Sequence, residues 1–305
     1  MSGENRVLIL GAGGQVGREL QRSFADFGTI VAIDHKSVDL AVPEQVRAVV
    51  KRVSPTLILN TAAYTAVDRA ESDAEQAMAI NAEAPRVLAE EARELNALLV
   101  HYSTDYVFDG TKPGPWTEDD ATHPLNAYGK SKLAGEEAIR RVGGAALVFR
   151  TSWIYGPHGK NFLLTMLRVG NERESLSVVD DQFGAPTSSI ALADATRAVV
   201  EGAVAGRFGS SATWAGLYHM TCGGSTNWCG FAEAIFSRAG DLLDGRRPLV
   251  KPIASSEYPT PAKRPRNSVL SNARLKERFG IALPAWEAAL DEVLGRLKME
   301  AKTNS

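Results

Sequence analysis

Tyr128 and Lys132 stand four residues apart in the segment NAYGKSKLAGE. On a helix this Tyr-x-x-x-Lys spacing places both side chains on one face, about 40° apart around the axis. An ammonium beside a phenol favours the phenolate, and a pKa fall of ~3 units from about 10 represents roughly 4 kcal/mol. Such a tyrosine can exchange a proton near neutral pH. The pair predicts acid–base catalysis, with two ordinary exposed helix residues as the alternative for the spacing alone.

Two hydroxyl groups precede this pair in the segment HYSTDYVFDG, which ends a buried-strand pattern. Ser103 and Thr104 fall at the carboxyl end of that strand, where ligands bind in open α/β sheets. One of these hydroxyls can donate a hydrogen bond to a substrate carbonyl oxygen. The two segments together therefore indicate proton transfer at a carbonyl group.

A glycine-rich turn follows the first apolar run in VLILGAGGQVG, and a helix over 15–27 is expected after it. Glycines let the backbone approach a pyrophosphate, and a helix N-terminus favours anions. The spacing is G-x-x-G-x-x-G, so an ordinary strand-to-helix turn is the alternative. We predict a dinucleotide site whose contacts come from this turn: Gly11, Gly13, Gly14, Gln15, Val16 and Gly17.

Asp34 ends the next predicted strand, 17 residues after Gly17. An acid at this point can accept hydrogen bonds from the adenine ribose, which favours NAD. His35 and Lys36 follow immediately and can receive a 2′-phosphate, so NADPH and NADH both remain open as the cofactor.

Two further segments are expected to reach the cofactor from strand ends. Asp39 and Leu40 are placed beside the adenine, although a solvated aspartate before a helix explains Asp39 equally well. In NTAAYTAVD, Ala62, Ala63 and Tyr64 lie where small side chains let the ribose and nicotinamide pass, and an unspecialised small-residue loop is the alternative.

Alternating strand and helix patterns position all of these residues. Continuous rather than alternating apolar runs indicate parallel strands covered on both faces. The predicted strands are Arg6–Leu10, Thr29–Asp34, Thr56–Asn60, Leu98–Ser103 and Ala146–Thr151, and the predicted helices between them include Pro43–Val53 and Ala74–Leu95. The pattern predicts an α/β fold with a Rossmann-like doubly wound parallel sheet.

The second half is less regular, and we expect a smaller, partly discontinuous α/β substrate lobe there. Residues 1–155 form the predicted NAD(P)-binding domain, residues 156–305 mainly the substrate lobe, and about 185–220 is expected to pack back onto the first domain. The expected elements are helices Asn161–Val169 and Ser189–Ala205, a strand Tyr218–Thr221, a helix capped by Thr226 or Asn227 and ending near Gly240, an extended loop over 251–270, and two short closing helices.

The composition of the chain argues against several classes of binding partner. The chain has 305 residues and 34 Lys+Arg against 36 Asp+Glu, a net charge of -2, which argues against nucleic acid. Apolar runs are too short for a membrane span, and the first residues do not resemble a secretory signal, so a cytoplasmic location is expected. Cys222 and Cys229 fit neither a disulfide scaffold nor a zinc pattern. Structural roles are expected for the five histidines, His35, His101, His123, His158 and His219, and no metal is predicted.

The motifs in this order resemble the extended short-chain dehydrogenase/reductase superfamily. Over nearly the whole chain they resemble, more closely, the dTDP-4-dehydrorhamnose reductase family. The segments that carry this resemblance are GAGGQVG, TAAYTAVDRAE, YSTDYVFDG, NAYGKSKLAGE, FRTSWIYG, NF followed by TML, DQFGAPT and RPRNSVL.

The resemblance implies reduction of the 4-keto group of dTDP-4-dehydro-β-L-rhamnose to dTDP-L-rhamnose, with NADPH or NADH as hydride donor. It implies Tyr128 as proton donor, Lys132 as its activator and ribose ligand, and Thr104 as ligand of the keto oxygen. Thr104, Asp105 and Trp153 are then substrate contacts, with a core aromatic role as the alternative for Trp153.

Four further residues, Arg264, Tyr106, Pro85 and Asn81, bear on this interpretation. Arg264 is the predicted contact of the substrate diphosphate, from a basic cluster that also holds Lys263 and Arg266, against the alternative of a solvated basic loop. Related dehydratases carry a glutamate where this chain has Tyr106, which favours simple reduction over water elimination. Pro85 leaves the Asn81 carbonyl without a helical partner, which predicts either a proton relay to Lys132 or merely a kinked helix.

Other functions stay open. A nucleotide-sugar epimerase needs the same Tyr/Lys pair, and a non-catalytic dinucleotide-binding regulatory subunit needs only the fold. Some family members hold a divalent metal with an acidic cluster at a dimer contact, but no such cluster is identifiable here. A homodimer remains open.

Overall fold

The computed structural model describes residues 5–303, and its centre is a six-stranded parallel sheet in the order β10-β5-β4-β3-β1-β2. Each pair is in parallel register, for example Val7 with Leu57 and Leu57 with Leu98. The strands are β1 (Arg6–Leu10), β2 (Thr29–Ile33), β3 (Leu57–Asn60), β4 (Leu98–Thr104), β5 (Ala146–Thr151) and β10 (Gly216–His219). The predicted Rossmann-like sheet is confirmed.

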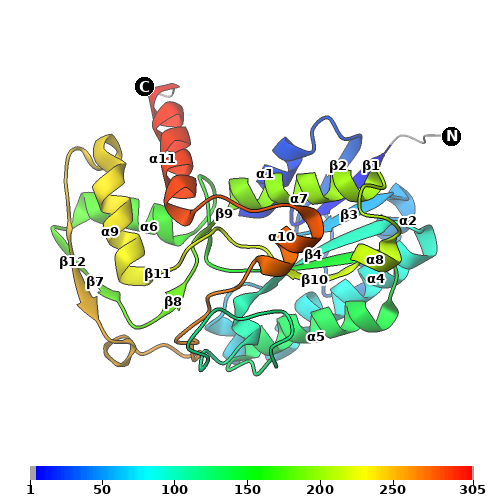
Figure 1. Ribbon diagram of the computed structural model, residues 1–305, viewed down its shortest axis with the longest axis horizontal. Coiled ribbons are helices and arrows are strands. Elements are labelled where there is room, and N and C mark those ends of the chain that lie inside the picture. Colours follow the sequence, from blue (N-terminus) through cyan, green and yellow to red (C-terminus); the bar gives the residue numbers. More distant parts are fainter. Residues whose placement is uncertain (1–4, 304–305) are drawn as a thin grey trace.

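Helices cover both faces of this sheet (Figure 1). On one face lie α1 (Gln15–Ser23) and α7 (Ser189–Val204), and on the other α2 (Pro43–Val53), α4 (Ala84–Leu95) and α5 (Ala127–Val142). Strand β1 serves both layers, since Val7 and Ile9 belong to the first apolar core and Leu8 and Leu10 to the second. Burial on both faces explains the continuous apolar runs of the sequence.

The segment predicted as one helix over 74–95 is interrupted. Helix α3 (Ala74–Met78) passes through a π-helical turn at Ala79–Glu83 before α4 begins. Pro85 has no N–H for the carbonyl of Asn81, so the regular ladder cannot continue there. The interruption brings Asn81 against α5, where a methyl group on Gly135 would collide with the Asn81 carbonyl.

The remaining elements form smaller sheets and helices beside the main sheet (Figure 1). Parallel β7 pairs with β12, antiparallel β8 with β11, and parallel β6 with β9. Their bounds are β6 (Ile154–Tyr155), α6 (Phe162–Glu172), β7 (Ser175–Val179), β8 (Phe183–Gly184), β9 (Thr187–Ser188), α8 (Ser211–Trp214), β11 (Thr226–Asn227), α9 (Trp228–Ala239), β12 (Leu249–Ile253), α10 (Ala273–Phe279) and α11 (Trp286–Thr303).

Several predicted bounds in this half were wrong. The expected loop over 251–270 begins inside β12, which a distant strand, β7, stabilises. The last helix has 18 residues and is not short, and β10 starts two residues before the predicted strand. Asn227 is the cap of α9, because its Oδ1 accepts from the Gly230 N–H at 2.7 Å.

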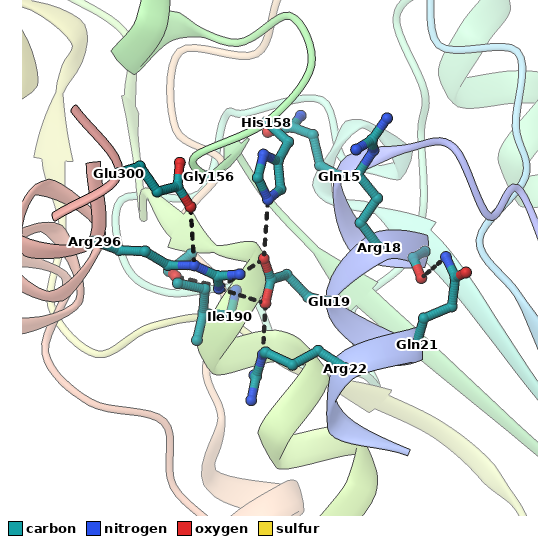
Figure 2. Close-up of polar contacts among 12 residues, drawn as sticks. Gln15, Arg18, Glu19, Gln21, Arg22, Gly156, His158, Ile190, Arg296 and Glu300 are labelled. Carbon is teal, nitrogen blue, oxygen red and sulfur yellow. Dashed lines mark hydrogen bonds and ion pairs between the residues drawn. The ribbon is translucent and has the colours of Figure 1, made fainter. Parts of the chain in front are cut away.

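A buried carboxylate joins α11 to α1. Glu19, 1% exposed, accepts from Arg22 Nε at 2.8 Å and from Arg296 Nη1 at 2.9 and 3.0 Å. His158 Nε2 lies 4.0 Å from the same carboxylate. Figure 2 shows these three side chains converging on Glu19 from α1, α11 and the loop after β6. We call these four residues the Glu19 cluster; it ties the C-terminal helix to the first helix of the main sheet.

Candidate active site

The glycine turn after β1 has the geometry that its residues require. Gly11 has φ +78°, and a Cβ there would lie 2.7 Å from the Ala62 nitrogen. The Gly14 N–H donates to the Gly11 carbonyl at 2.9 Å, and a methyl group on Gly17 would collide with that same carbonyl. The first and third glycines are therefore needed for the turn and its packing.

The outer part of the turn is open. Gly13 and Gly14 are exposed, and no atom lies within 4 Å of a Cβ built on Gly13. Gly14 caps α1 without a side chain, so the first N–H groups of α1 remain for a ligand. Val16 is buried, and the Gln15 side chain accepts from Asn161 Nδ2 at 2.9 Å. The turn fits a pyrophosphate at the N-terminus of α1.

Asp34 follows β2 directly beside this turn, since the Ala12 N–H donates to the Ile33 carbonyl at 3.0 Å. Its Oδ1 accepts from the N–H of Lys36 at 3.0 Å and the hydroxyl of Ser37 at 3.0 Å. The Ser37 bond is the main cause holding the pKa of this carboxyl below its usual range. Asp34 is thus an ionised acceptor at the carboxyl edge of the sheet.

The two other predicted adenine and ribose segments lie at the same edge. Asp39 is exposed and its Oδ1 accepts from the Ala41 N–H at 2.9 Å, a local turn before α2. Leu40 packs partly against the core on that side. Ala62 and Ala63 are half-buried in the loop after β3.

Asn81 holds the next residue of that loop. Its Oδ1 accepts from the Tyr64 N–H at 2.8 Å, and its Nδ2 donates to the Tyr64 carbonyl at 3.0 Å and to Ser131 Oγ at 2.9 Å. The side chain of Asn81 therefore links the cofactor loop to α5. The relay through its backbone carbonyl stays a prediction.

Thr104 and Asp105 are buried at the end of β4. Thr104 Oγ1 donates to Asp105 Oδ1 at 3.0 Å and accepts from the Tyr106 N–H at 3.2 Å. Among the described residues no hydrogen bond reaches Asp105 Oδ2. Burial raises the pKa of Asp105 to about 7. This carboxyl is therefore able to change its charge near neutral pH.

Tyr128 and Lys132 both lie on α5, close to that strand end. The Tyr128 ring packs edge-on against Tyr106, with centroids 6.0 Å apart. Burial raises the pKa of Tyr128 to about 12, and a hydrogen bond with Thr104 acts in the opposite direction. This direction is opposite to the lowering expected from Lys132. Thr104, Asp105, Tyr128 and Lys132 together are called the strand-end cluster.

Lys132 has polar partners of its own and makes no hydrogen bond to the phenol among the described residues. Its Nζ donates to the Tyr102 carbonyl at 2.6 Å and lies 3.3 Å from His101 Nε2. Burial lowers the pKa of Lys132 to about 8, while the Glu136 charge acts in the other direction. Lys132 is thus neutral in a large fraction of molecules at pH 8.

Trp153 and Arg264 are half-buried in interactions of their own. The Trp153 ring stacks on Trp228 at 3.6 Å and 4°, and its backbone has φ +47°. Both η-nitrogens of Arg264 donate to the Asp68 carboxylate, at 3.1 and 2.8 Å. The Arg264 guanidinium is therefore already paired, and its role at a diphosphate stays a prediction.

Sequence reasoning missed several neighbours of these residues. Asp68 and Trp228 pair with predicted residues over long separations and carry no local signal. His101 was assigned only a structural role, although it stands two positions before Ser103 on the same strand and faces Lys132. Alternation along the strand was the available signal for His101.

The fold and site define a class: a Rossmann-type short-chain dehydrogenase/reductase with a Tyr/Lys pair beside a dinucleotide turn. Residues 5–299 match the family described as RmlD substrate binding domain. A dTDP-4-dehydrorhamnose reductase from Burkholderia thailandensis is 50% identical over 289 residues, covering 93% of this chain and 96% of the relative. One from Escherichia coli K12 is 43% identical over 298 residues, covering 95% and 97%.

Solved structures agree. A dTDP-4-dehydrorhamnose reductase from Bacillus anthracis in complex with NADP superposes with a TM-score of 0.89 at 36% identity, covering 96% of this chain and 100% of that one. The chain belongs to the dTDP-4-dehydrorhamnose reductase family. It is an NAD(P)H-dependent oxidoreductase, as the sequence predicts.

Two further observations concern the described residues alone. Within residues 5–303 no three His, Cys, Asp or Glu side chains are grouped to hold a metal ion, and both cysteines are free and buried. No helix in that range is long and apolar enough to cross a bilayer.

Proposed function

We propose that this chain reduces the 4-keto group of dTDP-4-dehydro-β-L-rhamnose to give dTDP-L-rhamnose, the last step of dTDP-rhamnose synthesis. The observation that carries the proposal is the half-buried phenol of Tyr128, which packs against Tyr106 at the end of β4, lies within hydrogen-bond reach of Thr104 and keeps its proton because its pKa is raised. Reduction of a ketone needs one proton donor at the carbonyl oxygen, and this phenol is placed to provide it.

The cofactor is held, in this proposal, by the open turn at Gly13 and Gly14, by Asp34, and by the segments at 39–40 and 62–64. When bound, the nicotinamide supplies the hydride for carbon 4. Tyr128 protonates the oxyanion that forms, and the Thr104 hydroxyl donates a hydrogen bond to the same oxygen. The Lys132 ammonium stabilises the phenolate that Tyr128 leaves behind.

Thr104, Asp105, Trp153 and Arg264 are the proposed substrate contacts. Because the Arg264 guanidinium is paired with Asp68, a diphosphate at Arg264 must share it with that carboxylate. Tyr106 stays neutral, since burial raises the pKa of its phenol. A neutral phenol cannot act as the base that water elimination requires, which supports reduction.

The division into a cofactor domain, residues 1–155, and a substrate lobe, residues 156–305, also belongs to this proposal. Packing of α7 on α1 and pairing of β10 with β5 support the return of residues 185–220 to the first domain. A cytoplasmic location and a homodimer stay predictions.

The test is cofactor oxidation, followed by NADPH or NADH absorbance, with the keto-sugar present or omitted. Oxidation that depends on the keto-sugar supports the reductase. An epimerase instead purifies with bound nicotinamide and consumes none. A regulatory subunit shows no turnover and co-purifies with another enzyme. Parallel rates with both cofactors decide between NADPH and NADH.

A further inference from the structure

His101 lies beneath Lys132 and has no part in the mechanism described above. It is 1% exposed on β4, paired in register with Asn60 on β3. The residue two positions later, Ser103, points to the same helix, where its hydroxyl donates to Glu136. The side chain of His101 therefore faces α5 from the sheet. It lies two residues before Ser103, near the carboxyl end of β4.

Asn60 determines where the proton of His101 resides. Asn60 Oδ1 accepts from the Ala62 N–H at 3.3 Å, so its Nδ2 is the atom that faces His101 Nδ1, at 3.0 Å. An amide nitrogen only donates, so Nδ1 must be the unprotonated acceptor. Burial, helped by Lys132, holds the pKa of His101 well below its usual range. The imidazole is neutral, and its one proton is on Nε2.

That proton points at Lys132. The Nε2 to Nζ distance is 3.3 Å, and an ammonium also only donates. The contact is favourable when Lys132 is an amine that accepts the Nε2–H, and unfavourable when it is an ammonium. The position of Lys132 on the Tyr102 carbonyl is therefore one that suits its neutral form.

The other ionisable groups near this contact do not offset the unfavourable approach of the Lys132 ammonium to the Nε2–H of His101. From α5, Glu136 favours the ammonium, but its carboxylate is bound to Arg150 of β5 at 2.6 Å and to Ser103. Tyr128, also on α5, is neutral. Neither the glutamate nor the phenol accepts from Lys132 Nζ among the bonds of the described residues.

We propose that His101, held as the Nε2–H tautomer by Asn60, is a positioning residue that displaces the charged form of Lys132 from the Tyr102 carbonyl and directs it toward Tyr128 and the cofactor. The inference rests on the proposed function of Lys132. In this proposal the charge of Lys132 determines its position. The neutral amine stays on the Tyr102 carbonyl, and the ammonium moves toward the reacting carbonyl.

The first test is the pH profile of His101→Gln. A glutamine places its amide near the site of Nε2 and can rotate its oxygen toward Lys132, so it stabilises the ammonium on the Tyr102 carbonyl. We expect kcat at pH 7 to fall about tenfold with the KM for the keto-sugar within about twofold. The alkaline limb of kcat/KM, which reports the Tyr128/Lys132 pair, should move up by at least about half a pH unit.

His219→Gln is the matched control. His219 is likewise buried in the sheet, on β10, but its Nδ1 faces the Trp116 carbonyl at 3.1 Å and it does not contact Lys132. The same replacement there should leave the alkaline limb in place. An unchanged kcat and profile in His101→Gln, or an equal shift in both variants, overturns the inference.

The second test uses the wild-type protein and needs no substrate. Nitrogen NMR of the cofactor-free protein at pH 7, with the His101 signals assigned by their loss in His101→Gln, should show the Nε2–H tautomer. The Nδ1–H tautomer or an imidazolium contradicts the inference. In Asn60→Asp the donor becomes an acceptor, and we expect the proton to move to Nδ1.

Failure of the inference and failure of the proposed function are distinguishable. If wild-type protein does not oxidise cofactor with the keto-sugar, the proposed function fails whatever the tautomer. If wild-type protein is active but His101 has its proton on Nδ1, only the positioning role is lost.

Discussion

The strand-end cluster and the Glu19 cluster both bury ionisable side chains, but they treat the buried charge differently. Glu19, 1% exposed, is met by two guanidinium groups at 2.8 and 2.9 Å. Lys132, 2% exposed, donates instead to a neutral carbonyl, and Asp105 Oδ2 has no partner among residues 5–303. The Glu19 cluster pairs its buried charge with opposite charges, whereas the strand-end cluster leaves Lys132 and Asp105 without a counter-charge in the described part of the chain.

This difference separates structural from reactive burial. A buried charge without a counter-charge is destabilised, so its pKa moves toward the neutral form. Lys132 and Asp105 move to about 8 and about 7 in opposite directions from their usual values. The Glu136–Arg150 pair shows that compensation is available nearby, since it lies on the same helix and sheet. Changes in the strand-end cluster should therefore alter activity or relieve an unfavourable buried charge, whereas changes in the Glu19 cluster should lower stability.

The largest expected effect is that of Tyr128→Phe. Removing the phenolic proton removes the acid from the reacting carbonyl, and we expect kcat to fall about 10³-fold. NADPH affinity, measured by fluorescence titration, should stay within about threefold, because the glycine turn is untouched. The urea midpoint should change little. A variant that retains a tenth of wild-type kcat contradicts the assignment of Tyr128 as proton donor.

Asp105→Asn should make the protein more stable at pH 8. In the folded chain the pKa of Asp105 is raised, so between about pH 4 and pH 7 the folded state holds more protons than the unfolded state. Stability then falls as pH rises through this range, and the whole penalty, roughly 4 kcal/mol, is present above pH 7. Urea unfolding should show the variant and wild type equal near pH 4 and the variant more stable at pH 8.

Asp120→Asn provides the opposite sign. Lys112 and Thr117 lower the pKa of Asp120 to about 2, so its ionised form stabilises the folded state, and its removal should cost stability at pH 8. If the unfolding free energies of Asp105→Asn and wild type differ by the same amount at pH 4 and at pH 8, the ionised form of Asp105 is not destabilised by burial.

Much of the fold could be predicted because its signals are local. Continuous apolar runs identified the first five strands of the sheet, and Pro85 indicated where the helix over 74–95 is interrupted. The pairing of β7 with β12 was missed because two short strands, over 70 residues apart, stabilise each other only in three dimensions. The length of helix α11 was underestimated because a contact that stabilises it, between Arg296 and Glu19, joins residues 277 positions apart and cannot be seen in the local sequence.

The site divides in the same way. The glycine turn and the Tyr/Lys spacing are readable in the sequence, because each lies within one local element. The pairing of Arg264 with Asp68 spans 196 residues and has no sequence signal. The direction of the Tyr128 pKa was also missed: spacing places Lys132 on the same face of α5 but does not say whether Nζ points to Tyr128 or to Tyr102.

In the Glu19 cluster, Arg296→Met should cost more stability than Glu19→Gln. Loss of the arginine leaves a carboxylate that is 1% exposed with Arg22 as its main partner, whereas loss of the carboxylate leaves two guanidinium groups that are 29% and 42% exposed and still hydrated. We expect losses of about 2 and about 1 kcal/mol by urea unfolding, with kcat unchanged.

Arg168→Met is the control for this pair, since Arg168 and Glu172 are 64% and 53% exposed and their ion pair should contribute little. Equal losses for Arg296→Met and Arg168→Met would mean that Glu19 is not stabilised by its partners. A large fall in kcat for Arg296→Met would mean that the two clusters are coupled.

The smallest expected effect is that of His158→Gln. His158 Nε2 lies 4.0 Å from Glu19 Oε1 and the ring is 30% exposed, so its contact is longer and better hydrated than those of the two arginines. We expect a change in unfolding free energy below about 0.5 kcal/mol. Urea unfolding of His158→Gln beside wild type and Arg296→Met measures this difference. A loss as large as that of Arg296→Met would mean that the imidazole is a main partner of Glu19, whereas a loss within the expected limit leaves the two arginines as the groups that hold the carboxylate.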